Sequence, residues 1–162
     1  MALNAFLSLK GQVQGEIKGS VTQKGRENKI LVIAASHDII SPRDPASGQA
    51  SGKVQHKPFV ITKELDRSSP LLYQMLVTNE KITDWKLQFW AANRTARTGA
   101  GTERQHYSVT LKSASITGIN FRMLNTKDPE LSRFAEYEEI SFSYESITWT
   151  WEDGGITAQD DW

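Results

Sequence analysis

The residues that most resemble a ligand-binding motif lie in one stretch, SPRDPASGQASGKVQHKPF, at residues 41–59. A phosphate-binding loop has the pattern G-x-x-x-x-G-K-[ST] between a strand and a helix, so that backbone amides and a hydroxyl reach the phosphates and magnesium. Here only three residues separate Gly48 from Gly52, and Val54 follows Lys53 where a hydroxyl is needed. A strand-like pattern follows, so no helix N-terminus faces a phosphate. We therefore exclude a nucleotide-binding loop.

The histidines do not form a recognisable metal or catalytic set. His37, His56 and His106 lie far apart in the sequence, without an i,i+4 pair, and the chain has no cysteine. A zinc site needs three or four such ligands with supporting hydrogen-bond partners. In the triplet Ser36-His37-Asp38, neighbouring strand residues point to opposite faces, so Ser36 and His37 are poorly placed as nucleophile and base. The sequence predicts no cofactor, no metal and no enzyme activity.

Length and charge narrow the class of protein further. The 162 residues predict a single domain over residues 1–162, large enough to fold around its own core. Lys plus Arg and Asp plus Glu number 19 each, so the formal net charge is zero. The chain therefore lacks the basic excess typical of a nucleic-acid-binding protein. Zero net charge also imposes little long-range repulsion between copies, which permits self-association.

The N-terminal residues MALNAFLSLKGQ do not resemble a secretory signal peptide, because a basic region and a long apolar core are missing. No apolar run approaches the about 20 residues of a membrane-spanning helix. We therefore expect synthesis in the cytoplasm and no insertion into a membrane. If the protein leaves the cell, we expect export without a cleaved signal peptide.

Most of the chain alternates between apolar and polar residues with a period of two, which predicts β-strands. The continuous apolar run KILVIAASHDII, at residues 29–40, predicts a strand covered on both faces. Two strand patterns change parity, one across Thr117-Gly118 and one near Glu145-Ser146. Each change predicts a β-bulge.

One segment, SSPLLYQMLVTNE, has a helical pattern. Its apolar residues recur at three- and four-residue spacing, Ser69 is a suitable N-cap and Pro70 suits the first turn, which predicts a helix over about residues 69–79. The extended loop at about residues 41–57 exceeds the ~12–15 residues beyond which loops are usually functional or disordered. These patterns predict a mainly β fold: a compact β-barrel of two packed, mostly antiparallel sheets with one α-helix alongside and a long extended loop.

Three quoted segments resemble one known family along the whole chain. They are GEIKGSVTQKGRENKILVIAASHDI, PRDPASGQASGKVQHKPFVITKELDRSSPLLYQML and EYEEISFSYESITWTWEDGGITAQDDW. In this order they are similar to the Hcp proteins, the tube subunits of bacterial type VI secretion systems. The loop pattern PxDPxSGxxSGxxxHKPF and the ending ITWTWxDGG followed by DDW are the most specific parts.

The resemblance implies a structural protein rather than an enzyme. Hcp-like proteins form hexameric rings that stack into an inner tube, and a contractile sheath drives this tube out behind a spike protein. The implied partners are other copies of the chain, the spike, the sheath and effector proteins held in the ring lumen. The resemblance implies that the long loop contacts a neighbouring subunit or ring, and we assign this contact to Arg43, Asp44, Lys53 and His56. Ser36 is our candidate for a residue that faces cargo in the lumen.

Two other functions stay open at this point. The 5 Trp, 4 Tyr and 6 Phe residues also suit a small-ligand or carbohydrate-binding β-domain that forms no tube. Trp90 and Trp162 are candidates for an interface, where Trp is enriched. An Hcp with its own toxic enzyme activity is expected to carry an extra C-terminal domain, for which we see no room after the last predicted strand.

Overall fold

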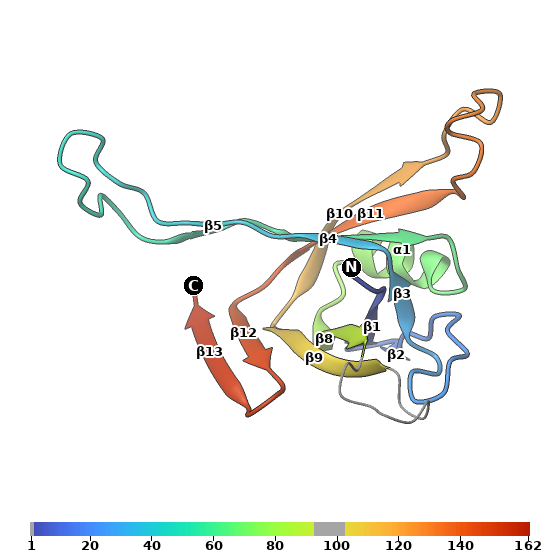
Figure 1. Cartoon of the computed structure of the whole chain (residues 1–162), viewed down its shortest axis with the longest axis horizontal. Helices are drawn as coiled ribbons and strands as arrows, with labels where there is room; N and C mark the ends of the chain where they lie inside the picture. Colours follow the sequence, from blue (N-terminus) through green and yellow to red (C-terminus); the bar gives the residue numbers. More distant parts are fainter. Residues whose placement is uncertain (1, 93–102) are drawn as a thin grey trace.

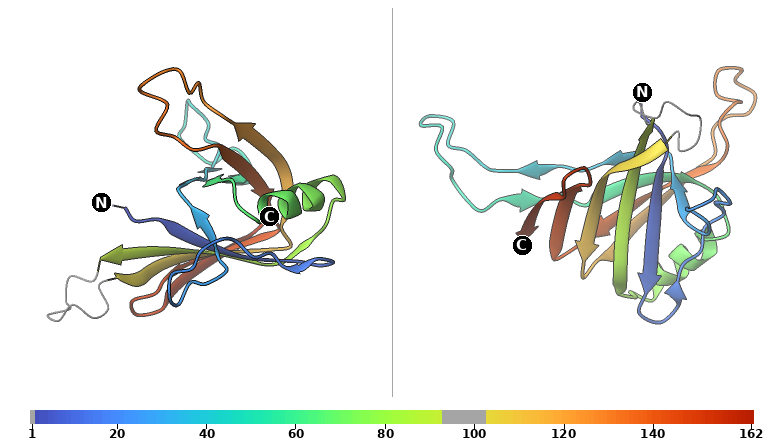
Figure 2. Two further views of the ribbon diagram at one scale, coloured as in Figure 1. Left: turned by 90° about the vertical axis from the view of Figure 1, so that its right-hand side faces the viewer. Right: turned by 60° about the horizontal axis from the view of Figure 1, so that its bottom comes forward.

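The structure is a computed structural model that describes residues 2–92 and 103–162. Two β-sheets pack against each other, a helix lies beside them, and a long arm projects away along the longest axis of the molecule (Figure 1). Figure 2 shows the same arrangement from two other sides, and its right-hand view shows the arm projecting beyond the sheets. The predicted mainly β fold, with packed antiparallel sheets, one helix and an extended loop, is confirmed.

The larger sheet has seven strands in the order β13-β12-β9-β8-β1-β2, with β3 also paired to β1. All of these pairings are antiparallel. β13 ends this order, so within the described residues only one of its two edges is paired. The strands are β1 Ala5–Gly11, β2 Gly15–Glu16, β3 Ile30–Val32, β8 Ile82–Ala92, β9 Glu103–Lys112, β12 Ser146–Trp151 and β13 Ile156–Asp161.

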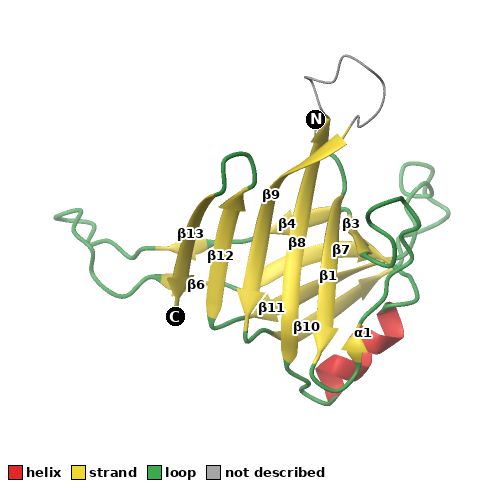
Figure 3. Cartoon of the chain, turned by 90° about the horizontal axis from the view of Figure 1, so that it is seen from below, coloured by secondary structure: helices red, strands yellow, loops and turns green. Residues whose placement is uncertain are grey.

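The smaller sheet has four antiparallel strands in the order β10-β11-β7-β4. It lies behind the larger sheet in Figure 3. Burial alternates along β7 and β11, as expected when one face of each strand points toward the other sheet. Its strands are β4 Ala34–Ser36, β7 Phe59–Glu64, β10 Ser115–Arg122 and β11 Tyr137–Ser143.

Aromatic residues from both sheets meet between them. The Trp85 ring of β8 lies 5.2 Å from the Phe59 ring of β7 and 5.4 Å from the Phe142 ring of β11, centroid to centroid. Both pairs are close to edge-to-face, which adds about 0.5–1.5 kcal/mol per pair beyond the burial of apolar area. All three side chains are almost fully buried, and they hold the two sheets face to face.

The chain crosses between the two sheets at places where the sequence pattern was ambiguous. The apolar run at residues 29–40 is not one strand covered on both faces: it breaks at Ile33, between β3 in the larger sheet and β4 in the smaller one. Ala34, Ala35 and Ser36 of β4 are exposed. The parity change at Glu145 is likewise a crossing and not a bulge, because β11 and β12 belong to different sheets.

The other predicted bulge is confirmed. In β10, Ile116 pairs with Phe142 and Gly118 pairs with Ser141, so Thr117 is the extra residue. One inserted residue shifts the parity of the side chains by one, which is the change visible in the sequence. The hydroxyl of Thr117 donates to the backbone carbonyl of Ser141, at 3.2 Å, across the irregularity.

The helix forms where it is predicted, with a different cap. α1 spans Ser69–Val77 and ends two residues before the predicted limit. Its N-cap is Ser68 rather than Ser69. Leu72 and Met75, on the predicted apolar face, are buried in the core shared by the two sheets.

Beneath the start of α1, a buried ion pair joins the helix to the smaller sheet. The Lys63 Nζ atom lies 2.7 Å from the Glu138 Oε1 atom, and neither side chain is exposed. The ammonium also donates to the Ser69 hydroxyl at 3.0 Å and lies 3.1 Å from Asp66 Oδ1. The Ser69 hydroxyl donates to Glu138 at 2.8 Å, so it serves this network rather than a cap.

Replacing Lys63 by alanine is expected to lower the free energy of unfolding by about 3–5 kcal/mol, because Glu138 is left as an unpaired buried charge. Urea unfolding followed by tryptophan fluorescence measures this change. Lys81 is exposed, and Lys81→Ala is the matched control, with an expected change within about 0.5 kcal/mol. Equal losses of unfolding free energy in Lys63→Ala and Lys81→Ala would contradict the stabilising role given to the Lys63–Glu138 pair.

A double variant separates the charge effect from lost packing. Lys63→Met combined with Glu138→Leu removes both charges and keeps apolar volume at both positions. We expect it to recover most of the stability lost by Lys63→Ala, since a buried ion pair is often replaced by apolar residues without loss. If the double variant is as unstable as the single one, the unpaired charge is not the cause.

Candidate functional site

The arm, residues 38–57, is the candidate functional site. Its two legs pair as a short ribbon, in which β5 Ile39–Ile40 is antiparallel to β6 Gln55–His56. Beyond the ribbon the chain continues outward to a tip, well separated from both sheets (Figures 1 and 2). The predicted loop at residues 41–57 is thus an extended projection whose base is a pair of strands.

The tip of the arm has its own internal structure, centred on Asp44. Its carboxylate accepts from the Ala46 backbone amide at 2.9 Å and from the Ser47 hydroxyl at 3.0 Å. Its backbone carbonyl accepts from the Gly48 amide at 2.8 Å. The amide of Ala46 and then the hydroxyl of Ser47 hold the pKa of Asp44 below its usual value. Asp44 therefore fixes the shape of the turn at the tip.

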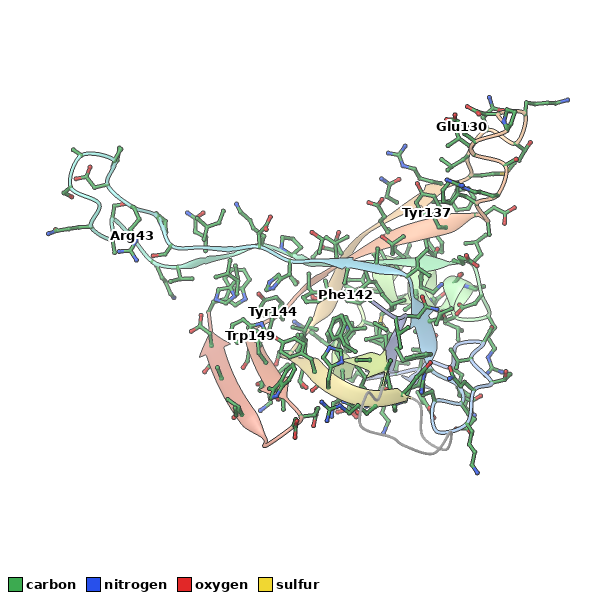
Figure 4. All side chains as sticks on the ribbon, viewed as in Figure 1. Arg43, Glu130, Tyr137, Phe142, Tyr144 and Trp149 are labelled. Atoms are coloured by element: carbon green, nitrogen blue, oxygen red, sulfur yellow. The ribbon has the colours of Figure 1, made fainter. Side chains whose placement is uncertain are left out.

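Arg43 and Lys53, on the two legs beyond the ribbon, are exposed. The ion pairs formed by the described residues include neither of them. Figure 4 shows Arg43 far out on the arm. Exposed apolar residues accompany these cations: Ile39, Ile40 and Val54. An exposed surface that combines apolar residues with unpaired charge is typical of a protein contact site.

The root of the arm is held by buried contacts. His56 of β6 has a side chain that is only 1% exposed, and its Nε2 atom lies 2.6 Å from Asp160 Oδ2 of β13. Its Nδ1 atom lies 2.8 Å from the Tyr144 hydroxyl. The His56 ring also stacks on Trp162, with centroids 5.8 Å apart and planes 13° apart. His56, which the sequence placed among the contact residues, thus lies inside the root and not on the outer surface of the arm.

The Tyr144 hydroxyl joins the two legs of the arm. Besides its contact with His56 on one leg, it lies 2.7 Å from the Nε2 atom of His37, directly before the other leg. Tyr144 stands at the crossing between β11 and β12, and Figure 4 shows it beneath the root of the arm. We call His37, His56, Tyr144, Asp160 and Trp162 the root cluster.

Burial shifts the pKa of two members of this cluster, Tyr144 and His37. Desolvation, and then the charge of Asp160, raise the pKa of Tyr144 to about 12, so its hydroxyl stays protonated near neutral pH. Desolvation is also the main cause that lowers the pKa of His37, and His56 adds to it. The Lys57 backbone, and then the charge of Asp38, act in the opposite direction and raise the pKa of His37.

The sequence-predicted site residues fall into four groups. Arg43 and Lys53 lie exposed on the arm, Asp44 organises its tip, and His56 belongs to the root cluster. Ser36 lies apart from them, exposed on the edge strand β4, where it pairs with Val60. Its role toward cargo in the lumen stays a prediction.

Sequence reasoning missed most of the root cluster. Tyr144 and Asp160 contact His56 across separations of 88 and 104 residues, which no local pattern reveals. The one available signal was the parity change beside Tyr144, since it marks where the chain leaves one sheet for the other.

The aromatic residues behind the ligand-binding alternative mostly serve packing. Trp85 is part of the core, and the Arg26 guanidinium covers Trp90 at 3.7 Å from the ring centroid. Trp162 is half exposed and borders an open hollow of about 510 Å³, whose other lining residues are polar or charged: Lys112, Ser113, Glu145, Ser146, Gln159 and Asp161. If the protein were a small-ligand or carbohydrate-binding domain, this hollow is where the ligand would bind.

Metal-binding clusters and membrane-spanning helices also bear on function. Among residues 2–92 and 103–162, no three His, Cys, Asp or Glu side chains are grouped so that they would hold a metal ion. Nor does that part of the chain contain a helix with the length and apolar character needed to cross a membrane.

The chain is thus a two-sheet β fold with a long exposed arm that is rooted by buried hydrogen bonds. A family model described as "Type VI secretion system effector, Hcp" matches residues 6–151. The chain therefore belongs to the Hcp family of type VI secretion systems, as its sequence motifs indicated.

Individual relatives agree with this family. The "Major exported protein" of Pseudomonas aeruginosa is 39% identical, with 100% of this chain and 96% of the relative covered. A structure titled "Crystal structure of Hcp protein" superposes with a TM-score of 0.88 at 29% identity, over 100% of this chain and 98% of the other. A variant of the Hcp1 protein from E. coli EAEC 042 has a TM-score of 0.84 at 31% identity, over 99% of both chains.

Replacing Asp44 by alanine is expected to loosen the tip of the arm and leave the thermal stability of the fold unchanged, because the tip contributes nothing to the core. Hydrogen exchange should quicken at the Ala46 amide, which loses its acceptor. Asp44→Asn keeps a side-chain oxygen acceptor and is the control, expected to stay close to the unmodified protein. Unchanged exchange in Asp44→Ala would contradict the role given to Asp44.

The same turn has a predictable pH dependence. The pKa of Asp44 is lowered from its ordinary value of 3.8 by bonds that need the carboxylate. Protection of the Ala46 amide should therefore be present at and above that ordinary value and be lost as the pH falls through the lowered pKa. Loss of protection at higher pH would show that another group controls the turn.

Proposed function

We propose that this protein is the structural subunit of a type VI secretion inner tube, which assembles into hexameric rings that stack into the tube. The observation that carries the proposal is the arm, which projects far from the sheets and bears exposed cations and apolar side chains. Family membership supports it independently.

The position of the arm favours a head-to-tail contact. The arm leaves one end of the longest axis, while α1 and the loop before β3 lie toward the other end (Figure 1). If the arm of one copy contacts a different surface on the next, the contact is heterologous, and repeated copies close into a ring or continue as a stack. The unpaired edge of β13 offers a second place where a neighbouring copy can add hydrogen bonds.

The finer parts of the function follow from the family. We propose that sheath contraction propels the tube out of the cell, that a spike protein sits at its tip, and that effector proteins ride in the lumen, where Ser36 is the candidate contact. The protein would be made in the bacterial cytoplasm and secreted without a cleaved signal peptide. The relative described as a "Major exported protein" supports secretion. No catalytic step belongs to this proposal.

Light scattering on the purified protein tests the assembly. We expect a mass of six chains, with larger species as the concentration rises and rings stack. A monomer at every accessible concentration would contradict the proposal. Saturable binding of a small ligand to that monomer would instead favour the ligand-binding alternative.

Reversing one charge on the arm tests its part in stacking. In Lys53→Glu we expect unchanged unfolding, because Lys53 is exposed and far from the core, but weaker stacking of rings by light scattering. Lys127 is equally exposed on the β10–β11 connection, and Lys127→Glu is the matched control for net charge. Deletion of residues 47–54 is the larger change and should weaken stacking further. Equal stacking in all of these variants would show that the arm takes no part in the contact between rings.

A further inference from the structure

We propose that a hollow beside the loop before β3 receives the arm of a neighbouring copy, with Glu64 as the carboxylate that pairs with Lys53. The inference rests on the proposed function, because it names the surface to which the arm binds. The hollow has a volume of about 400 Å³, and its lining comes from β1, β3, the loop before β3 and the end of β7. None of these segments belongs to the arm.

The hollow combines an apolar lining with carboxylates. Phe6 of β1 and Leu31 of β3 contribute apolar surface, and Leu65, directly after β7, is 43% exposed. Glu64 and Asp66 stand on either side of Leu65 in the chain and also line the hollow. Its volume lies within the about 300–1,000 Å³ of ordinary ligand pockets, which is enough for a few side chains of an inserted segment. Covering this exposed apolar lining with apolar side chains is favourable, since it removes the lining from water.

Of the two carboxylates, Glu64 is the one left for a partner. Asp66 Oδ1 lies 3.1 Å from the Lys63 Nζ atom and accepts from the Ser68 amide at 2.8 Å. Glu64 is exposed and takes part in none of the ion pairs formed by the described residues. The neighbouring Arg67 is used inside the fold, where it donates to two oxygens of the loop before β3.

The arm carries the complementary features. Lys53 is exposed and absent from the ion pairs of the described residues, and the residue after it, Val54, is 40% exposed. The two isoleucines of β5 add exposed apolar surface on the other leg. Residues 41–54 contain the cations Arg43 and Lys53 against one carboxylate, Asp44, which is bonded within the tip. The outer arm thus presents positive charge beside apolar side chains.

The positions of the two surfaces determine which copies can meet. The arm leaves one end of the longest axis, whereas the loop before β3 and the end of β7 lie toward the other end (Figure 1). An arm therefore reaches the hollow of a different copy and not its own. The contact joins two different surfaces, so it is heterologous and can repeat from copy to copy. Opposite charges at its centre fix the orientation of the arm in the hollow.

A charge swap tests the pair. Lys53→Glu and Glu64→Lys should each weaken association between copies, measured by light scattering, by roughly fivefold, because each brings like charges together. The double variant should return to within about twofold of the unmodified protein, since it restores an opposite-charge pair. Both side chains are exposed, so urea unfolding should be unchanged.

The control for the swap uses Glu130, which is exposed on the β10–β11 connection. Lys53→Glu combined with Glu130→Lys has the same net charge as the swap but no restored pair at the hollow. It should associate as weakly as Lys53→Glu alone. Recovery in the swap that does not exceed recovery in this control would overturn the inference.

Crosslinking gives a readout that does not depend on affinity. The chain has no cysteine, so Lys53→Cys combined with Glu64→Cys places thiols only on the arm and at the hollow. A short bismaleimide is the reagent, because the backbones of a Lys–Glu pair lie farther apart than a disulfide allows. We expect a ladder of more than two copies, whereas each single variant can give only dimers. Lys53→Cys with Glu130→Cys is the matched control.

The outcomes separate this contact from the proposed function. A ladder no longer than that of the control would overturn the inference, and rings seen beside it would leave the tube function standing. Abundant dimers of the single Glu64→Cys variant would mean that two hollows face each other, which also overturns it. Unchanged association in Glu64→Lys would overturn it and leave the hollow to a small ligand. A ladder without a species of six chains in light scattering would support the contact, and the tube function would fail.

Discussion

The aromatic contact around Trp85 is the constraint on which the rest of the structure depends. It holds β8 of the larger sheet against β7 and β11 of the smaller one. Two sheets of one chain that share a core need places where the chain passes from one to the other, and two of these places lie at Ile33 and Glu145. The first crossing leads through β4 into the arm, and the second carries Tyr144 directly before it. The core thus brings the two parts of the arm root together.

An arm that is ordered before it meets a partner loses less conformational freedom on binding. Here order is imposed at both ends of the projection. The Asp44 carboxylate organises the tip by accepting from the Ala46 amide and the Ser47 hydroxyl, and the root cluster fixes the legs against β13 and the β11–β12 crossing. The residues between these points keep exposed charge and apolar surface, which is the combination that another copy of the chain would recognise.

The sequence predicted the parts of the fold that depend on local pattern. The alternation of apolar and polar residues predicted the strands, and the three- and four-residue spacing of apolar residues predicted α1. The parity change at Thr117-Gly118 correctly predicted a bulge. The same kind of parity change at Glu145 was misread, because a bulge and a crossing between sheets shift the side chains in the same way. Of the candidate site, only the arm could be predicted, because it is continuous in the sequence. The root cluster could not, because His56 meets Tyr144 and Asp160 only through the fold.

The central claim is that the arm is the part by which one copy of this Hcp-family chain contacts the next. Electron cryo-microscopy of the assembled protein tests it most directly. The account predicts stacked rings in which density for Arg43 and Lys53 lies against a neighbouring copy, with His56 and Tyr144 still joined at the root. Rings or stacks in which the arm extends into solvent and touches no other copy would contradict it.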